Sequence, residues 1–188
     1  MQLKTILLSL AAATAVIATP VPDSDKHADL NGWRPSNCLN DQQAAAFVQT
    51  FTQAEQTDGN DTTTFNSLIE SLANSGDQEI SDSINFFTKT PYGEITEPNL
   101  AAIEAGHAHA GKGVYQITTL NIWHTCNVIT WRWRFLLFPG ATPVQGINVF
   151  VLGSNGKIDQ TYIEFNSAAW AQDVGYKITP PSGPARKK

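Results

Sequence analysis

The stretch LNIWHTCNVITWRWRFLLF, residues Leu120–Phe138, decides the fold. Two apolar runs in and around it flank the polar pair Cys126-Asn127. Successive side chains of a β-strand point to opposite faces. The residues that share one face of the second run are all large and apolar: Trp131, Trp133, Phe135 and Leu137. Aromatic and β-branched residues favour sheets. We therefore interpret the stretch as the central hairpin of an antiparallel sheet.

Further strands follow this hairpin. The four predicted strands from this point are 115–125, 129–138, 144–152 and 157–165. The turn Gly153-Ser154-Asn155-Gly156 joins the last two, and both Asn155 and Gly156 tolerate the positive φ that tight hairpins use. An earlier segment, Glu79–Phe87 (EISDSINFF), also predicts a strand. Its proposed inner face contains Ile80, Asp82, Ile84 and Phe86.

Helical spacing of apolar residues predicts three helices before the four strands and one after them. Their predicted ranges are 40–56, 62–74, 99–110 and 167–174. Asn40 can cap the first helix, and Gln43 stands at the spacing of a capping box. The order of elements predicts an α+β fold.

The beginning of the chain predicts secretion. Lys4, an apolar run and Val16-Ile17-Ala18 give residues 1–18 the pattern of a signal peptide. Residues 19–37 are expected to form a flexible leader and 177–188 a disordered basic tail, which leaves one domain at 38–176. The apolar run is about twelve residues long, shorter than the roughly 20 that a membrane span needs. Without residues 1–18, 11 basic residues stand against 17 acidic ones, which argues against a nucleic-acid partner.

The chain has two cysteines, Cys38 and Cys126. An even number in a secreted chain favours a disulfide between them. A reactive thiol or a metal ligand is the alternative, although the pair lacks zinc-site spacing. Asn60-Asp61-Thr62 is an acceptor sequence for N-glycosylation in a polar, turn-like stretch, so we predict a glycan at Asn60.

The order of helices and strands resembles the NTF2-like fold. The stretches that carry the resemblance are CLNDQQAAAFVQTFTQ, SDSINFF, LNIWHTCNVITWRWRF and GINVFVLGSNGKIDQTYIEFNSAAWAQDVG, within residues 38–175. They look like the secreted NTF2-like (SnoaL-like) domain proteins of filamentous fungi. The resemblance implies a curved, mainly antiparallel sheet wrapped as a cone around about three helices. The wider superfamily includes isomerases, dehydratases and cyclases, and also domains that do no chemistry, so the fold alone implies no activity.

The resemblance offers Asp82 as the first catalytic candidate. Its predicted strand is similar to the one that carries the general base in ketosteroid isomerase, although a serine, Ser83, follows it where that enzyme has proline. Burial among Ile80, Ile84 and Phe86 would raise the pKa of the Asp82 carboxyl toward the range of a general base. The alternative is a structural aspartate that accepts hydrogen bonds. His124, near the end of its strand, is the second candidate, and its alternative is a hydrogen-bonded structural histidine.

A ligand pocket is predicted from the same resemblance. Matching the turn at 153–156 to that of the isomerase points one set of side chains into the cone and points Tyr162 and Glu164 outward. The predicted pocket residues are Phe86, Asn148, Phe150, Thr161, Ile163 and Phe165. No metal site is expected, because His107 and His109 stand at helical positions that do not share a face.

These observations predict a non-catalytic domain with a hydrophobic cavity, which binds a small hydrophobic molecule or serves as an interaction module, with no cofactor. The main alternative is a lyase or isomerase for a polyketide- or steroid-like substrate, with Asp82 as base and His124 or a tyrosine as helper. A third hypothesis is a secreted effector that acts through protein contacts. The resemblance also implies a homodimer that pairs through the outer face of the sheet.

Overall fold

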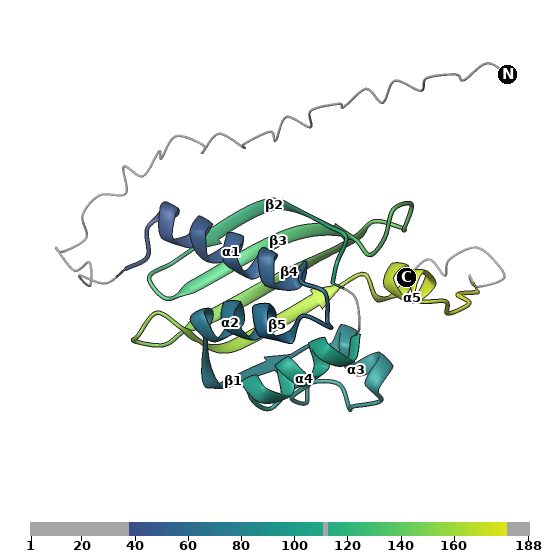
Figure 1. The fold of residues 1–188 in the computed structure, drawn as a ribbon, viewed down its shortest axis with the longest axis horizontal. Coiled ribbons are helices and arrows are strands. Elements are labelled where there is room, and N and C mark those ends of the chain that lie inside the picture. Colours follow the sequence, from purple (N-terminus) through teal and green to yellow (C-terminus); the bar gives the residue numbers. More distant parts are fainter. Residues whose placement is uncertain (1–37, 111–112, 180–188) are drawn as a thin grey trace, which may run out of the picture. The chain divides into compact units, whose positions relative to one another are not determined.

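The computed structural model describes residues 38–110 and 113–179. The predicted signal peptide and leader, and the predicted tail from residue 180 onward, lie outside the described residues. The described helices are α1 (Asp41–Glu55), α2 (Thr62–Leu72), α3 (Asp82–Thr88), α4 (Leu100–Ala110) and α5 (Ser167–Asp173). The described strands are β1 (Ala73–Ile80), β2 (Gln116–His124), β3 (Val128–Leu136), β4 (Val144–Leu152) and β5 (Ile158–Phe165). Figure 1 shows their arrangement.

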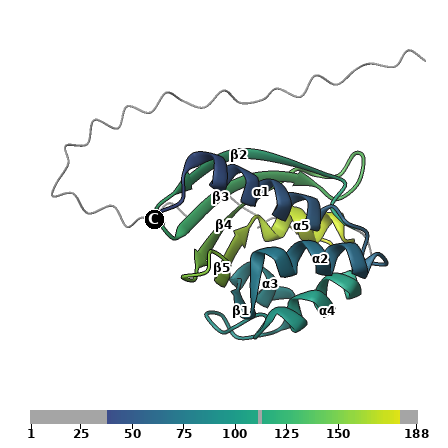
Figure 2. The ribbon, with the colours of Figure 1, turned by 60° about the vertical axis from the view of Figure 1, so that its left-hand side comes forward.

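The strands form one five-stranded sheet in the order β1-β5-β4-β3-β2. The three pairs from β2 to β5 are antiparallel, while β1 pairs with β5 in parallel. The predicted central hairpin is confirmed, with His124 opposite Ile129, and the β2–β3 register shifts between Thr119 and Asn121. Figures 1 and 2 show α1 and α2 lying against one face of this sheet. The α+β fold with a curved, mainly antiparallel sheet is thus confirmed, with five described helices where about three were expected.

The alternation predicted for the hairpin is also confirmed. Trp131 and Trp133 are buried, and the two arginines between and after them are exposed on the opposite face. The indole of Trp133 lies so close to β4 that a Cβ added at Gly146 would stand 2.3 Å from its Cζ2 atom. Only glycine allows that approach.

Helix α1 forms as the sequence predicts. Asn40 and Gln43 make the reciprocal capping box, with both hydrogen bonds at 2.9 Å. The buried face of α1 then packs on the sheet. Phe47 and Phe51 lie 5.1 Å and 4.8 Å from Phe150, measured between ring centroids. This aromatic layer fills the space between α1 and the central strands.

The strand predicted over 79–87 is wrong. The strand is β1, which begins at Ala73 and ends at Ile80, and α3 follows it. Ser81 starts the helix because its hydroxyl accepts a hydrogen bond from the Ile84 backbone at 3.1 Å. The Glu164 carboxylate, from β5, accepts two more, from the Asp82 and Ser83 backbone amides at 3.0 and 3.2 Å. These donors would otherwise lack partners in the first turn of a helix.

Cys38 and Cys126 form the predicted disulfide. The bond joins the residues just before α1 to the turn between β2 and β3. A backbone hydrogen bond from Leu39 to Cys126, 3.3 Å long, supports the same junction. The start of α1 is therefore attached covalently to the central hairpin.

Candidate functional site

Three of the predicted pocket residues lie inside the fold, and each is in contact with other side chains. Asn148 accepts a 2.7 Å hydrogen bond from the indole of Trp133, and both residues are buried. Thr161 donates to the carboxylate of Asp77 at 3.4 Å, and Phe150 is fully buried under α1. The alternation predicted for β4 and β5 is correct, but these side chains build the core.

The other three predicted pocket residues differ in position. Ile163 and Phe165 are partly buried against the core, and Phe165 lies 5.8 Å from Trp170 between ring centroids. Phe86 is 57% exposed, because it belongs to α3 and not to a strand. Its predicted place beside Ile80 and Ile84 on an inner strand face is therefore wrong.

The structure does not bring Asp82 and His124 together. Asp82 follows β1 and His124 ends β2, and these are the two opposite edges of the sheet. The Asp82 carboxylate accepts a 2.6 Å hydrogen bond from the Gly93 backbone. His124 Nε2 lies 2.7 Å from the Asp41 carboxylate in the first turn of α1. Asp82 and His124 thus each have a polar partner nearby in the fold. This agrees with the alternative interpretation of each as a structural residue.

Histidines 107 and 109 do not act as a pair. His107 is half-buried and stacks on Phe65, with ring centroids 3.6 Å apart. Its Nε2 lies 3.1 Å from the Thr57 carbonyl, and burial lowers the pKa of the imidazole. Within residues 38–110 and 113–179, no three His, Cys, Asp or Glu side chains are grouped to bind a metal ion. In the same residues no helix has the length and apolar character that crossing a membrane requires.

Four carboxyl groups, none of them predicted from the sequence, converge beside β1. Burial raises the pKa of Glu55, in the last turn of α1, to about 7. Burial, and then the charges of Glu55, Glu97 and Asp77, raise the pKa of Glu79 to about 8. Burial also raises the pKa of Asp77 to about 6 and raises that of Glu97. Groups that hold protons near neutral pH can transfer them, but none of the four lines the hollows described next.

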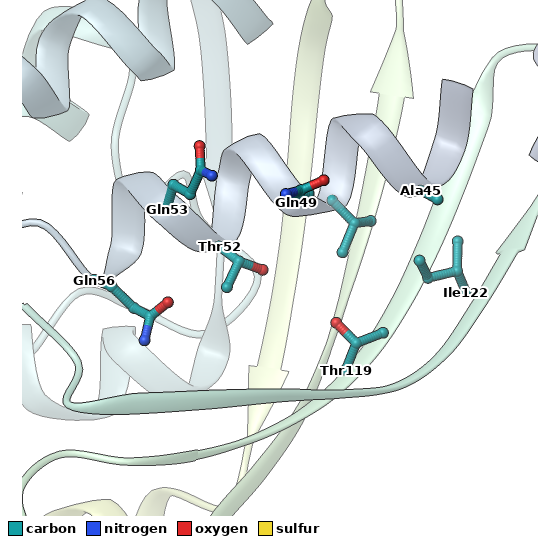
Figure 3. A pocket seen from close by; sticks show the side chains of 8 residues that line it. Ala45, Gln49, Thr52, Gln53, Gln56, Thr119 and Ile122 are labelled. Carbon is teal, nitrogen blue, oxygen red and sulfur yellow. The ribbon is translucent and has the colours of Figure 1, made fainter. Parts of the chain in front are cut away.

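A hollow of about 410 Å³ lies between α1 and β2 (Figure 3). Its lining is formed by Ala45, Val48, Gln49, Thr52, Gln53, Gln56, Thr119 and Ile122. A second hollow, near Arg134 and Pro143, is smaller at about 110 Å³. Six lining residues of the larger hollow come from one side of α1, and the other two come from β2 on either side of its register shift.

The lining of this α1–β2 hollow is electrically neutral. Val48 and Ile122 supply apolar surface. The polar groups of the lining are the amides of its glutamines and the hydroxyls of its threonines. The hydroxyl of Thr119 accepts a 3.0 Å hydrogen bond from the indole of Trp131. The Oγ1 atom of Thr52 is buried and has no hydrogen-bond partner. Buried polar atoms usually have one, so this atom needs an explanation.

Two patterns in the sequence concern these sites, and only the second, at Glu55, is informative. Ala45, Gln49, Thr52 and Gln56 follow one another at helical spacing, so they share one side of α1. A polar side of a helix normally faces water, so the local sequence cannot distinguish such a side from the wall of a pocket. Glu55 lies four residues after Phe51, on the buried side of the same helix. That burial was readable from the helical period.

The comparisons with known proteins agree with the fold. The sequence model of the NTF2-like domain matches residues 37–177. A comparison with the sequences of curated proteins finds no match.

Among solved structures, a SnoaL-like protein from Jannaschia sp. CCS1 has a TM-score of 0.55 at 12% identity, covering 80% of this chain and 100% of its own. A SnoaL-like family protein from Agrobacterium tumefaciens C58 has a TM-score of 0.52 at 15% identity, with 66% and 98% covered. A SnoaL-like protein of unknown function from Burkholderia thailandensis E264 has a TM-score of 0.51 at 12% identity, with 68% and 98% covered. At such identities the likeness concerns the fold alone. The match over residues 37–177 shows that the chain belongs to the NTF2-like domain family.

Proposed function

We propose that this domain binds a small neutral molecule in the α1–β2 hollow. One observation carries the proposal: a hollow of about 410 Å³ with eight neutral lining residues, one of which has an unpartnered buried hydroxyl. Pockets for small molecules commonly have about 300–1,000 Å³, with an apolar lining and a few polar groups that orient the ligand. The hollow has this volume, and it is open to solvent, with apolar side chains at its base and amides and hydroxyls around them. It is not the central cavity predicted from the sequence.

The lining also indicates the charge of the ligand. A charged molecule that enters such a site loses water and gains no opposite charge, which costs free energy. Val48 and Ile122 instead favour an apolar body, and the amides of Gln49 and Gln53 favour neutral hydrogen-bonding groups at its edge. Figure 3 shows the glutamines along α1, with Thr119 and Ile122 across from them on β2.

The proposed role is binding without catalysis. None of the eight lining residues is titratable, so the hollow offers no side chain for acid–base chemistry. The lyase or isomerase alternative would have to use Asp82, which lies beyond the opposite edge strand and without His124 beside it. Turnover by an Asp82→Asn variant on any substrate found tests that alternative directly.

A fragment titration tests the binding proposal. The domain, labelled with ¹⁵N, is titrated with a library of neutral fragments while amide shifts are followed by NMR. We expect shifts centred on Gln49, Thr119 and Ile122. An Ala45→Phe variant should fill the hollow and abolish them. Ala46→Phe is the matched control, since Ala46 is an exposed alanine on the same helix that does not line the hollow.

Two results would overturn the proposal. One is that no neutral fragment shifts these amides at millimolar concentration. The other is that the bulky side chain at position 45 leaves binding unchanged.

We also propose that two copies pair through the outer face of the sheet. Trp123 and Tyr162 are 51% and 40% exposed there, and the strand register places them in one row with Thr130 and Val149 between them. Ile147 is 37% exposed on the same face. Such apolar side chains are common at the centre of dimer interfaces.

Sedimentation equilibrium tests the pairing. We expect a dimer at micromolar concentration and a monomer for Tyr162→Glu. Asp159→Asn, which changes an exposed residue near the start of β5, should leave the dimer intact. A native protein that stays monomeric at 100 times higher concentration would contradict the pairing.

Secretion remains a proposal, supported by the pattern of residues 1–18 and by the disulfide. Expression of the full chain in a secreting fungal or yeast host should release protein whose first residue is Thr19. Retention of Met1 on intracellular protein would contradict it. The effector hypothesis depends on this secretion and assigns a role to no particular residue.

A further inference from the structure

We propose that the α1–β2 hollow selects neutral ligands that carry a carbonyl oxygen, which the hydroxyls of Thr52 and Thr119 bind together. This inference rests on the proposed binding function of the same hollow. It adds the chemical group that the ligand must present and the two residues that recognise it.

Thr119 supplies the first donor. A hydroxyl has one proton to donate and two lone pairs that accept. The Thr119 oxygen already accepts the indole N–H of Trp131 at 3.0 Å, and no described residue accepts its own proton. Because Trp131 is buried in the core, that contact holds the hydroxyl oxygen in place. The free proton of Thr119 is therefore available on the side of the hollow.

Thr52 supplies the second donor, from the opposite wall. A threonine within a helix often bonds to the carbonyl four residues earlier, as Thr50 does with Ala46 at 3.1 Å. Thr52 makes no such bond, and its Oγ1 atom is buried without a partner. Thr52 is one of the residues that line the hollow, so a ligand bound there can supply the acceptor that this hydroxyl lacks.

A carbonyl oxygen fits this pair of groups. It has two lone pairs and can accept from both hydroxyls at once, whereas a saturated hydrocarbon leaves both unsatisfied. The rest of the ligand would contact Val48 and Ile122, which also line the hollow. A ketone or ester with a compact apolar body is the simplest molecule of this class.

A pair of matched ligands tests the inference. Acetophenone carries the carbonyl, and α-methylstyrene replaces its oxygen with a methylene group of similar size. Affinities of the folded domain for both are measured by NMR titration. We expect acetophenone to bind about tenfold more tightly, which corresponds to one or two net hydrogen bonds.

The variants Thr52→Val and Thr119→Val keep the side-chain shape and remove one hydroxyl each. Each should reduce the preference for acetophenone several-fold. Thr50→Val is the matched control, because its hydroxyl bonds within the helix and does not line the hollow; it should leave the preference unchanged. Thr52→Val removes an unpartnered group, so it should fold at least as stably as the native protein.

The outcomes separate the two proposals. Equal affinity for both compounds, or a carbonyl preference that survives both valine variants, overturns the selection by the threonines while the binding function stands. If neither compound binds and the neutral fragment library is also silent, the binding function fails, and the inference fails with it.

Discussion

Replacing Glu79 by glutamine should stabilise the protein at neutral pH. The Glu79 carboxyl lies in β1, where burial and the charges of Glu55, Glu97 and Asp77 raise its pKa from 4.5 to about 8. Glutamine has nearly the same shape and no charge. The variant therefore removes the cost of ionising this group inside the fold without opening a cavity.

The direction of the pH dependence follows from the raised pKa. The folded state holds the Glu79 proton more tightly than the unfolded chain does, so Glu79 contributes most to stability below about pH 4.5. That contribution is lost progressively as the pH rises from 4.5 to about 8. At pH 7 the loss spans about 2.5 pH units above the unfolded pKa, or roughly 3 kcal/mol at 1.36 kcal/mol per unit. Because the side chain is only partly buried and its neighbours titrate with it, we expect the variant to gain about 1–3 kcal/mol.

Urea unfolding at pH 4.5, 7 and 9 measures this effect. At pH 7 and 9 the Glu79→Gln variant should unfold at higher urea concentration than the native protein, with an unchanged slope. At pH 4.5 the two should nearly coincide. Glu94→Gln is the matched control, since Glu94 is an exposed glutamate outside this group of carboxyls. It should change the free energy of unfolding by less than about 0.5 kcal/mol.

Two results would refute the reasoning. If Glu79→Gln destabilises the protein at pH 7, the carboxylate makes a favourable contact that the burial argument omits. If its effect is the same at pH 4.5 and pH 9, the change does not come from ionisation.

Three further changes have defined outcomes. Reducing the bond between Cys38 and Cys126, or replacing both with serine, should lower the free energy of unfolding by about 4.5 kcal/mol in the chain-entropy model, since 88 positions separate them. A loss below about 1 kcal/mol in denaturant titrations would contradict that value. Gly146→Ala should cost about 1–3 kcal/mol by thermal unfolding, because its Cβ would overlap the Trp133 indole, and an unchanged midpoint would show that the indole moves freely. When both are secreted from a eukaryotic host, the Asn60→Gln variant should migrate faster on a gel than the native protein, by the mass of one glycan. Identical mobility of the two proteins would refute glycosylation at this exposed site.

Local patterns in the sequence predicted most of the elements. Trp131 and Trp133 alternate with Arg132 and Arg134, and the structure keeps that alternation because one face of β3 covers the core and the other is exposed. The capping box at Asn40 set the start of α1 correctly, since it needs only residues three apart. Each of these signals depends only on residues within one helical turn or one strand.

The error at 79–87 shows where such signals fail. The alternation of Ile80, Ile84 and Phe86 suggests a strand, while Ser81 can equally cap a helix. The segment forms the helix α3, which the Glu164 carboxylate supports by accepting hydrogen bonds at its first turn. Glu164 lies 82 residues after Asp82, the first residue whose backbone amide it binds. The parallel pairing of β1 with β5 likewise depends on a partner that is distant in sequence. The periodicity of a short segment cannot reveal which distant segment will pair with it.

The sequence by itself determined the α+β class, the central hairpin, the first helix and the cysteine pairing, because periodicity, capping and composition act over short distances or through covalent chemistry. Only the tertiary structure decided the candidate site. It filled the predicted cavity with Phe150, Asn148 and Thr161, and it separated Asp82 from His124 at opposite sheet edges. It also turned a polar side of α1 into the wall of a hollow. The physical reason is that burial and proximity depend on how elements pack against each other, and a side chain becomes part of a site only when another element faces it.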